Sequence, residues 1–217
     1  MRVISFSVFG PDRMYSLGAV KNAELCRELY PGWVCRIFAG RSIHRDDRKQ
    51  LGAMSNVDLV QVAEPEDWSA LFWRYLSLGD ESADMHLFRD ADSRPCRREA
   101  AAVDEWLASG QDFHIMRDHK QHWIEILGGM WGCTAEGARR IRSLLPDPLW
   151  NSEPWVDQWW LRDHVYPVAR RSMIVHDSIG HIPGEGARPF PTPRVPGRFV
   201  GQGFHADGSP RVLADAI

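Results

Sequence analysis

The amino-acid sequence predicts a single α/β domain with a mainly parallel sheet flanked by helices. Strand-like apolar segments alternate with helical segments four times before Asp90, a pattern typical of a parallel sheet with crossover helices. The length of 217 residues suits one domain. Apolar residues make up 44% and charged residues 25%, an ordinary globular composition that argues against general disorder.

The first half of the chain carries this alternation most clearly. Residues 2–8 mix β-branched and aromatic side chains and end at Gly10 and Pro11, which is typical of a strand followed by a turn. Leu and Val then recur near helical spacing from Leu17 to Leu29, and Pro31 ends that helix. The further strands expected here are residues 33–38, 57–62 and 85–88, and the further helices are residues 45–51 and 67–78.

The second half is expected to add helices at residues 97–107, 135–145 and 156–164 and strands at residues 113–116, 125–127 and 172–176. After residue 180 six prolines interrupt any regular element. We therefore expect a domain at 1–179 followed by a Pro/Gly/Arg-rich tail at 180–217. The tail contains Phe190, Phe199 and Phe204, side chains that disordered segments lack, so it is expected to pack back near the active site.

Charge and hydropathy exclude several classes of protein. Lys and Arg total 26 against 29 Asp and Glu, so the net charge of -3 offers no basic excess for nucleic acid. No apolar run approaches the roughly 18 residues of a membrane helix. The N-terminus resembles a strand more than a signal peptide, which predicts a cytoplasmic protein without a transmembrane segment. The four cysteines are too far apart for a zinc knuckle.

Three common catalytic motifs are also missing from the sequence. No G-x-G-x-x-G follows the first strand, so a dinucleotide site has no support. Neither a phosphate-binding G-x-x-x-x-G-K-[ST] loop nor a G-x-S-x-G nucleophile elbow occurs.

The most informative segment is Leu87-Phe88-Arg89-Asp90-Ala91-Asp92-Ser93-Arg94, which follows an apolar strand. Alternate residues of an extended segment point the same way, so Asp90 and Asp92 can face one cation. Carboxylate oxygens suit Mg²⁺ or Mn²⁺. D-x-D is a common tripeptide, and an Asp that caps the next helix is the structural alternative. The D-x-D motif here follows a strand of an α/β sheet, where ligands bind, and this position favours a functional role over helix capping.

On these residues the chain resembles GT-A nucleotide-sugar glycosyltransferases of the small bacterial type, whose fold is a Rossmann-like sheet flanked by helices. Three segments carry the resemblance besides F-R-D-A-D-S-R. They are Phe72-Trp73-Arg74-Tyr75, Ile115-Met116-Arg117-Asp118-His119 and Leu127-Gly128-Gly129-Met130-Trp131-Gly132. The motif order is also similar to the retaining galactosyltransferase and glycogenin group, with D-x-D, a Gly-rich turn, Asp157-Gln158 and a late His176.

The resemblance implies a metal site and a donor site. It assigns Asp90, Asp92 and His176 as ligands of Mn²⁺ or Mg²⁺, with binding of the ribose as an alternative role for Asp90. A single strand-end histidine is more often structural, and only the motif order favours His176. The nucleotide-sugar residues expected from the resemblance and the local pattern are Ser7, Phe9, Arg74, Asp90, Ala91, Gly128, Gly129 and Trp131. Trp131 is expected to offer a stacking face to the sugar.

The catalytic residues expected on the same basis are Asp157, Gln158 and Asp118. Asp157 would contact the sugar hydroxyls and Gln158 would lie near the anomeric carbon. If the reaction inverts the anomeric centre, Asp157 or Asp118 becomes the general base. An acid in a first helical turn is also a routine partner of the helix dipole.

The function expected is transfer of a sugar from a nucleoside diphosphate donor, by default UDP, to an acceptor hydroxyl in cell-surface glycan synthesis. One alternative is a binding domain of the same fold without catalysis. The other is a phosphatase of the haloacid dehalogenase type, in which the D-x-D belongs on the first strand. Here three expected strands precede it.

Overall fold

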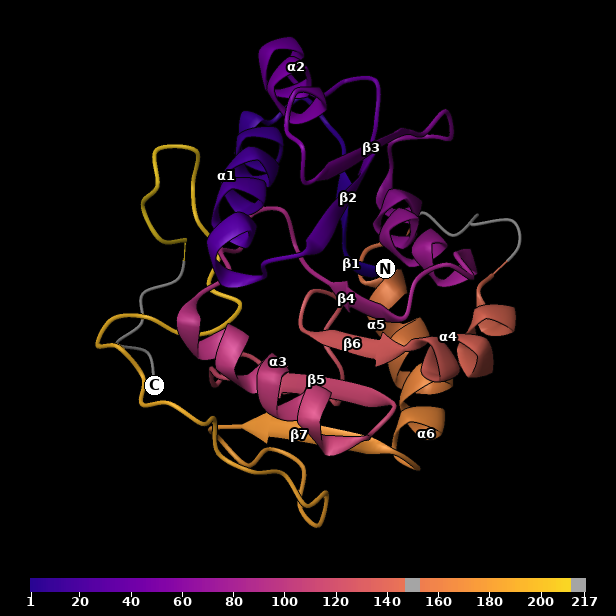
Figure 1. Cartoon of the computed structure of the whole chain (residues 1–217), viewed down its shortest axis with the longest axis vertical. Coiled ribbons are helices and arrows are strands. Elements are labelled where there is room, and N and C mark those ends of the chain that lie inside the picture. The colour runs from indigo at the N-terminus through magenta and orange to yellow at the C-terminus, as the bar shows by residue number, and fades with distance from the viewer. Residues whose placement is uncertain (147–152, 212–217) are drawn as a thin grey trace.

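A computed structural model describes residues 1–146 and 153–211 of the chain. It contains one seven-stranded sheet in the order β3-β2-β1-β4-β6-β5-β7 (Figure 1). The strands are β1 (Arg2–Val8), β2 (Trp33–Ala39), β3 (Val57–Gln61), β4 (Met85–Phe88), β5 (Phe113–Arg117), β6 (Trp131–Thr134) and β7 (Met173–Asp177). The pairs β3-β2, β2-β1, β1-β4 and β5-β7 are parallel, so the predicted mainly parallel α/β fold is confirmed.

The helical elements account for most of the remaining chain up to β7. They are α1 (Arg13–Leu29), α2 (Arg45–Gly52), the 3₁₀ segment η1 (Trp68–Gly79), α3 (Arg97–Ser109), α4 (Ala135–Ile141), η2 (Arg142–Leu144), α5 (Val156–Trp160), the π-helical turn η3 (Leu161–Val165) and α6 (Tyr166–Ala169). None of the helices in the two described ranges is long and apolar enough to cross a membrane.

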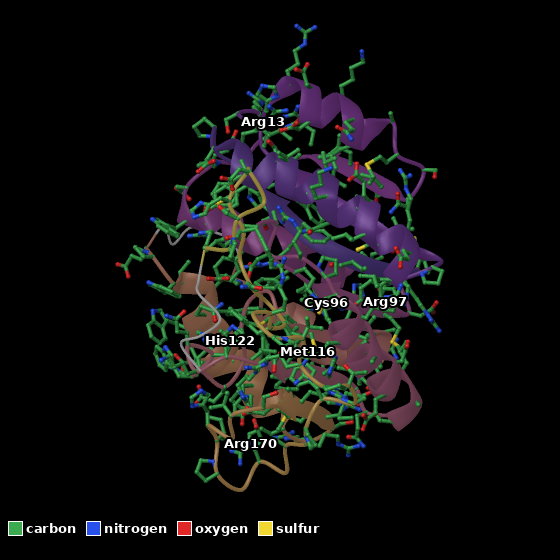
Figure 2. All side chains as sticks on the ribbon, turned by 90° about the vertical axis from the view of Figure 1, so that its left-hand side faces the viewer. Arg13, Cys96, Arg97, Met116, His122 and Arg170 are labelled. Atoms are coloured by element: carbon green, nitrogen blue, oxygen red, sulfur yellow. The ribbon has the colours of Figure 1, made fainter. Side chains whose placement is uncertain are left out.

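The helices cover both faces of the sheet, so β1 and β4 are buried on both sides. Ile4 and Phe6 pack into a core with residues of α1. Ser5, which points the opposite way, donates a hydrogen bond to the Arg74 carbonyl of η1 (2.7 Å). On β4, Leu87 belongs to the first core and Phe88 to a second core with η1 and α5. Side chains fill the space between the ribbons, and Met116 is fully buried near the middle of the molecule (Figure 2).

One strand was predicted in the wrong place. Residues 125–127 form no strand, and the strand of this region is β6, six residues later. The Gly128-Gly129 turn precedes β6 and brings it back antiparallel between β4 and β5. The predicted helix at 156–164 is also replaced by three short helical segments that continue to Ala169.

The position of β1 creates the point at which ligands bind in such sheets. The chain runs from β1 outward through β2 to β3, and β4 then returns to the other side of β1. The loops that follow β1 and β4 therefore diverge and leave a crevice beyond their carboxyl ends. The Asp90-Ala91-Asp92 turn follows β4 at this crevice.

Helix α1 holds the turn in place through a close backbone approach. Asn22 donates from Nδ2 to the Ala91 carbonyl (3.2 Å). A Cβ on Gly18 would lie 2.2 Å from that same carbonyl oxygen. Only glycine therefore lets the D-x-D turn pack on α1 at this distance.

We predict that Gly18→Ala destabilises the protein by about 2 kcal/mol, because the added methyl group must push the turn away from α1. The control is Gly52→Ala, whose Cβ would meet Leu59 at an ordinary 3.8 Å. Urea denaturation measures both, and the control is expected to be neutral or stabilising because alanine favours a helix. Equal stabilities for the two variants would contradict the close packing.

Candidate active site

A pocket of about 350 Å³ lies at the carboxyl ends of β1 and β4. Six residues expected at the donor or metal site line it, namely Ser7, Phe9, Arg74, Asp90, Ala91 and Asp92. Five further residues complete the lining, which are Tyr15, Glu66, Asp67, Trp68 and Leu71. The structure thus brings together residues from the first 92 positions that lie far apart in the sequence.

The buried guanidinium of Arg74 is the centre of the polar network. Its side chain is 3% exposed, and it forms ion pairs with Asp90 through Nη1 and with Asp157 through Nη2, the latter at 2.7 Å. Burial alone would lower the pKa of Arg74, but the neighbouring Tyr75, Asp90 and Asp157 raise it instead. The cation is therefore permanent, and it fixes one acid of the D-x-D turn relative to α5.

Two adjacent glycines allow the backbone to lie against this network. A Cβ on Gly129 would lie 2.1 Å from the Asp90 carboxylate. A Cβ on Gly128 would lie between 2.6 and 2.8 Å from the polar ends of Gln158, Arg74 and Asp157. The predicted Gly-rich turn is therefore in contact with the predicted catalytic pair, and no other residue type fits there.

Asp157 and Gln158 are both buried beside the Gly128-Gly129 turn. Burial raises the pKa of Asp157, and the charge of Arg74 only partly opposes that rise. Gln158 is 9% exposed, and among the described residues no group hydrogen-bonds its Oε1 atom. A buried amide oxygen without a protein partner costs free energy of folding. It is therefore suited to accept a hydrogen bond from a hydroxyl group of a ligand.

The chain enters α5 through a strained residue. Trp155, the N-cap, has a φ of 67°, which makes it the non-glycine residue with positive φ in the described part of the chain. This turn places Asp157 and Gln158 in the first turn of the helix, with both side chains directed inward. Local strain of this kind is frequent where a functional group must be held in one position.

The second acid, Asp92, is contacted by the tail. The Phe204 amide donates to the Asp92 carbonyl (2.8 Å), and Arg211 forms an ion pair with the Asp92 carboxylate. Burial and the nearby charge of Asp90 raise the pKa of Asp92. The two acids are thus close enough to repel each other, and each has a single arginine partner.

His176 does not join these acids. It lies at the end of β7, and β6 and β5 separate that strand from β4. The His176 Nδ1 atom pairs with His114 Nε2 (2.9 Å), and its Nε2 atom lies 3.3 Å from Glu105 Oε2. Its assignment as a third metal ligand is therefore wrong in this structure, and the structural alternative for a strand-end histidine describes it.

Trp131 also differs from its predicted role as a stacking face for the sugar. It is fully buried on β6 and stacks on Phe88, with ring centroids 4.3 Å apart. Because neither ring face reaches a pocket, Trp131 supports the core and has no face to offer a sugar.

Asp118 is neither exposed nor free to take a proton. Its carboxylate accepts hydrogen bonds from Arg98 (3.1 Å), Ser178 (2.6 Å), Arg194 (2.7 Å) and the Val200 amide (2.9 Å). Burial raises its pKa, but these donors together lower it below the usual value. Asp118 therefore anchors the tail, and this structure does not support its expected role as a general base.

Ser7 has a structural role within the pocket wall. Its hydroxyl donates to the Leu71 carbonyl (3.1 Å) and accepts from the Arg74 amide (2.9 Å). Both bonds join β1 to η1, so Ser7 positions Arg74. Glu66, a pocket residue that was not predicted from the sequence, accepts hydrogen bonds from the amides of Gly10, Arg41 and Ser42. Only its place in a polar loop after β3 could have indicated it.

We predict that Arg74→Met lowers the free energy of unfolding by about 3 kcal/mol or more, because it leaves Asp157 buried without a cation. The double variant Arg74→Met/Asp157→Asn is expected to recover part of that loss. Arg139→Met, which removes an exposed pair with Glu136, serves as control and should change stability by under about 1 kcal/mol. Urea denaturation of all three would reject the network if Arg74→Met matched the control.

Comparisons with known proteins bear on the fold. No family model and no curated protein matches the chain. Among solved structures, residues 1–349 of TarS from S. aureus align with a TM-score of 0.56 at 11% identity, covering 82% of this chain and 58% of that one. A glycosyltransferase involved in glycosylation of the major capsid of PBCV-1 aligns at 0.49, with 16% identity and coverage of 84% and 86%. A putative glucose-1-phosphate thymidylyltransferase from Bacillus anthracis also aligns at 0.49, with 13% identity and coverage of 82% and 86%.

At sequence identities this low, the comparisons show the fold alone. The chain has the GT-A fold that its sequence resemblance implies.

Proposed function

We propose that the chain is a cytoplasmic glycosyltransferase that moves a sugar from a nucleoside diphosphate donor to an acceptor hydroxyl. UDP is the expected nucleotide, and cell-surface glycan synthesis is the expected role by analogy. The observation that carries the proposal is the pocket at the β1/β4 switch point, where two carboxylates stand beside the buried Arg74–Asp157 pair. The four free cysteines agree with a reducing compartment.

The residues of the D-x-D turn suit Mn²⁺ or Mg²⁺. Asp90 and Asp92 each use one carboxylate oxygen for an arginine, which leaves each a second oxygen. Burial and, after it, repulsion from Asp90 raise the pKa of Asp92, and a cation between the two acids would relieve that repulsion. No third His, Cys, Asp or Glu joins them within residues 1–146 and 153–211, so diphosphate oxygens and water would complete the coordination. When bound, the ion would neutralise the negative charge of the leaving diphosphate.

The remaining chemistry belongs to the residues around Arg74. Arg74 holds Asp90 and Asp157 in fixed positions, so little reorganisation is needed when a donor enters. We assign Asp157 to the hydroxyls of the donor sugar and the free Oε1 atom of Gln158 to the region of the anomeric carbon. The Ser7–Phe9 segment at the end of β1 would face the base and ribose.

We predict that Asp92→Asn leaves the protein folded and abolishes Mn²⁺-dependent binding of UDP, since a neutral amide is a poor ligand for a hard cation. Isothermal titration with UDP in the presence and absence of Mn²⁺ measures the effect. The control is Asp163→Asn, an exposed acid of η3 that is paired with its neighbour Arg162. Metal-dependent binding retained by Asp92→Asn would refute the assignment of the cation site.

We further predict that the anomeric configuration is retained. The order of the D-x-D turn, the Gly128-Gly129 turn and the Asp157-Gln158 pair supports this, as does the close approach of Gln158 to Gly128. NMR of the first-formed product, recorded before mutarotation, decides the question. An inverted product would instead make Asp157 the general base for the acceptor hydroxyl, a role that its raised pKa suits.

The tail is proposed to cover the donor site and to become more ordered when donor and metal bind. Residues 180–211 contact Asp92 and Asp118, whereas residues 212–217 lie outside the described part of the chain. We expect UDP with Mn²⁺ to slow tryptic cleavage after Arg198 severalfold, because a closed tail is a poor protease substrate. UDP without metal is the control. A cleavage rate unchanged by UDP with Mn²⁺ would show that the tail only wraps the sheet.

A further inference from the structure

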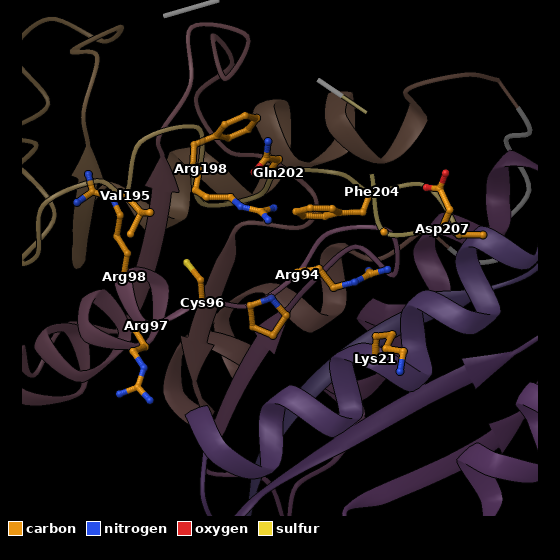
Figure 3. A pocket seen from close by; sticks show the side chains of 14 residues that line it. Lys21, Arg94, Cys96, Arg97, Arg98, Val195, Arg198, Gln202, Phe204 and Asp207 are labelled. Atoms are coloured by element: carbon orange, nitrogen blue, oxygen red, sulfur yellow. The ribbon is translucent and has the colours of Figure 1, made fainter. Parts of the chain in front are cut away.

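A second cavity of about 580 Å³ lies between the tail, the start of α3 and helix α1 (Figure 3). One wall comes from residues 195–208 of the tail, and the other comes from residues 94–98 and Lys21. This cavity shares no lining residue with the donor pocket. The proposed sugar transfer therefore gives it no role.

The charge of this cavity is opposite to that of the whole chain. Five cationic side chains line it, which are Lys21, Arg94, Arg97, Arg98 and Arg198, and its acidic side chain is Asp207. Three of the cations already have acidic partners. These pairs are Lys21 with Glu24 (3.0 Å), Arg97 with Glu28 (2.7 Å) and Arg98 with Asp118 (3.1 Å).

Arg94 and Arg198 differ from the other three cations. Within residues 1–146 and 153–211, no carboxylate forms an ion pair with either of them. Arg94 instead donates from Nη1 to the carbonyls of Ala91 (3.1 Å) and Ser93 (2.7 Å). It is partly buried, and Asp92 is the acid whose charge acts on it most directly. A partly buried guanidinium that forms no ion pair can still gain from an anion that binds directly to its N–H groups.

The two arginines converge on one aromatic ring. The guanidinium carbon of Arg94 lies 5.6 Å from the centroid of Phe204, and that of Arg198 lies 5.0 Å from it. Figure 3 shows the Arg198 side chain extending toward Phe204, while Arg97 points away from the cavity. The positive charge is thus concentrated next to an apolar surface.

The rest of the lining is largely apolar. Pro95, Val195 and Phe199 contribute hydrocarbon surface. Burial raises the pKa of the Cys96 thiol to about 11, so this side chain is uncharged at neutral pH. Cys96 is also the N-cap of α3, a helix of 13 residues whose N-terminus adds partial positive charge. The cavity therefore combines an anion-binding end with an apolar end.

We propose that this cavity is a binding site for an organic phosphate, with the phosphate between Arg94 and Arg198 and the organic part against Phe204 and Pro95. Arginine binds phosphate oxygens through parallel N–H donors, and the neighbouring ring and hydrocarbon surface suit a planar or apolar group. A ligand here would also reach the donor site indirectly. Arg94 bonds the Ala91 carbonyl, and the Phe204 amide bonds the Asp92 carbonyl, so both contacts join this cavity to the D-x-D turn.

The test uses the full chain without divalent cations and the probes phenyl phosphate and inorganic phosphate. Calorimetric titration is expected to show that phenyl phosphate binds more tightly than inorganic phosphate. Arg198→Gln should weaken phenyl phosphate about tenfold, because Arg198 is exposed and its substitution removes one charged contact without disturbing the turn. Arg171→Gln, an exposed arginine after α6, is the matched control and should leave the affinity unchanged.

A second variant separates the two ends of the cavity. Phe204→Leu should weaken phenyl phosphate severalfold and leave inorganic phosphate nearly unchanged, because only the organic part loses its contact. Saturating UDP with Mn²⁺ should not displace the probe, since the two pockets have separate linings. If phenyl phosphate fails to bind, binds Arg198→Gln as it binds Arg171→Gln, or is displaced by UDP, the proposal is overturned.

The phosphate could belong to a free metabolite or to a lipid headgroup. Sedimentation with vesicles of phosphatidylcholine, with and without phosphatidic acid, distinguishes these sources. Binding that requires phosphatidic acid and is lost in Arg198→Gln identifies a lipid phosphate in this cavity. If only the soluble probes bind, the ligand is a free organic phosphate, and vesicle binding that survives Arg198→Gln counts against the cavity.

Discussion

The buried charge of Arg74 is the constraint on which the candidate site depends. A guanidinium that is 3% exposed must be neutralised within the protein, and its two partners come from opposite halves of the sequence. Asp90 follows β4, and Asp157 lies in α5. The requirement to pair one cation with both acids therefore fixes the distance between the D-x-D turn and the helix that carries Gln158. It also explains why glycines occur at positions 128 and 129, where any side chain would collide with these groups.

Much of the fold could be predicted because its signals are local. Alternating apolar segments and the Gly and Pro residues between them located every strand except one, and the D-x-D turn was expected at the end of β4, where it lies. The exception was β6, since residues 125–127 are as apolar as a strand. Which of two neighbouring apolar segments joins the sheet depends on the turn at Gly128-Gly129 and on the space between β4 and β5, and neither is visible in a single sequence.

The site was predicted less evenly, and the reason is again physical. The residues expected at the donor site that follow β1 and β4 line one pocket, because the carboxyl ends of adjacent parallel strands must meet. His176 and Trp131 were misassigned because motif order along the chain does not specify order across the sheet. The late strand β7 pairs with β5 at the edge, so a histidine at its end cannot reach β4. Trp131 lies on a central strand with helices on both sides, and a large aromatic residue there is needed for packing.

Asp118 shows how an acid at a strand end can serve the site without catalysing anything. Its carboxylate accepts from side chains of α3, the segment after β7 and the tail, and from the Val200 amide. A tail with many prolines forms few backbone hydrogen bonds of its own, so a buried anion with several donors can order it at one point. From that point the chain runs through Phe204 to Asp92. The same tail thereby forms a wall of the cavity at Arg94 and Arg198 and also contacts the second acid of the D-x-D turn.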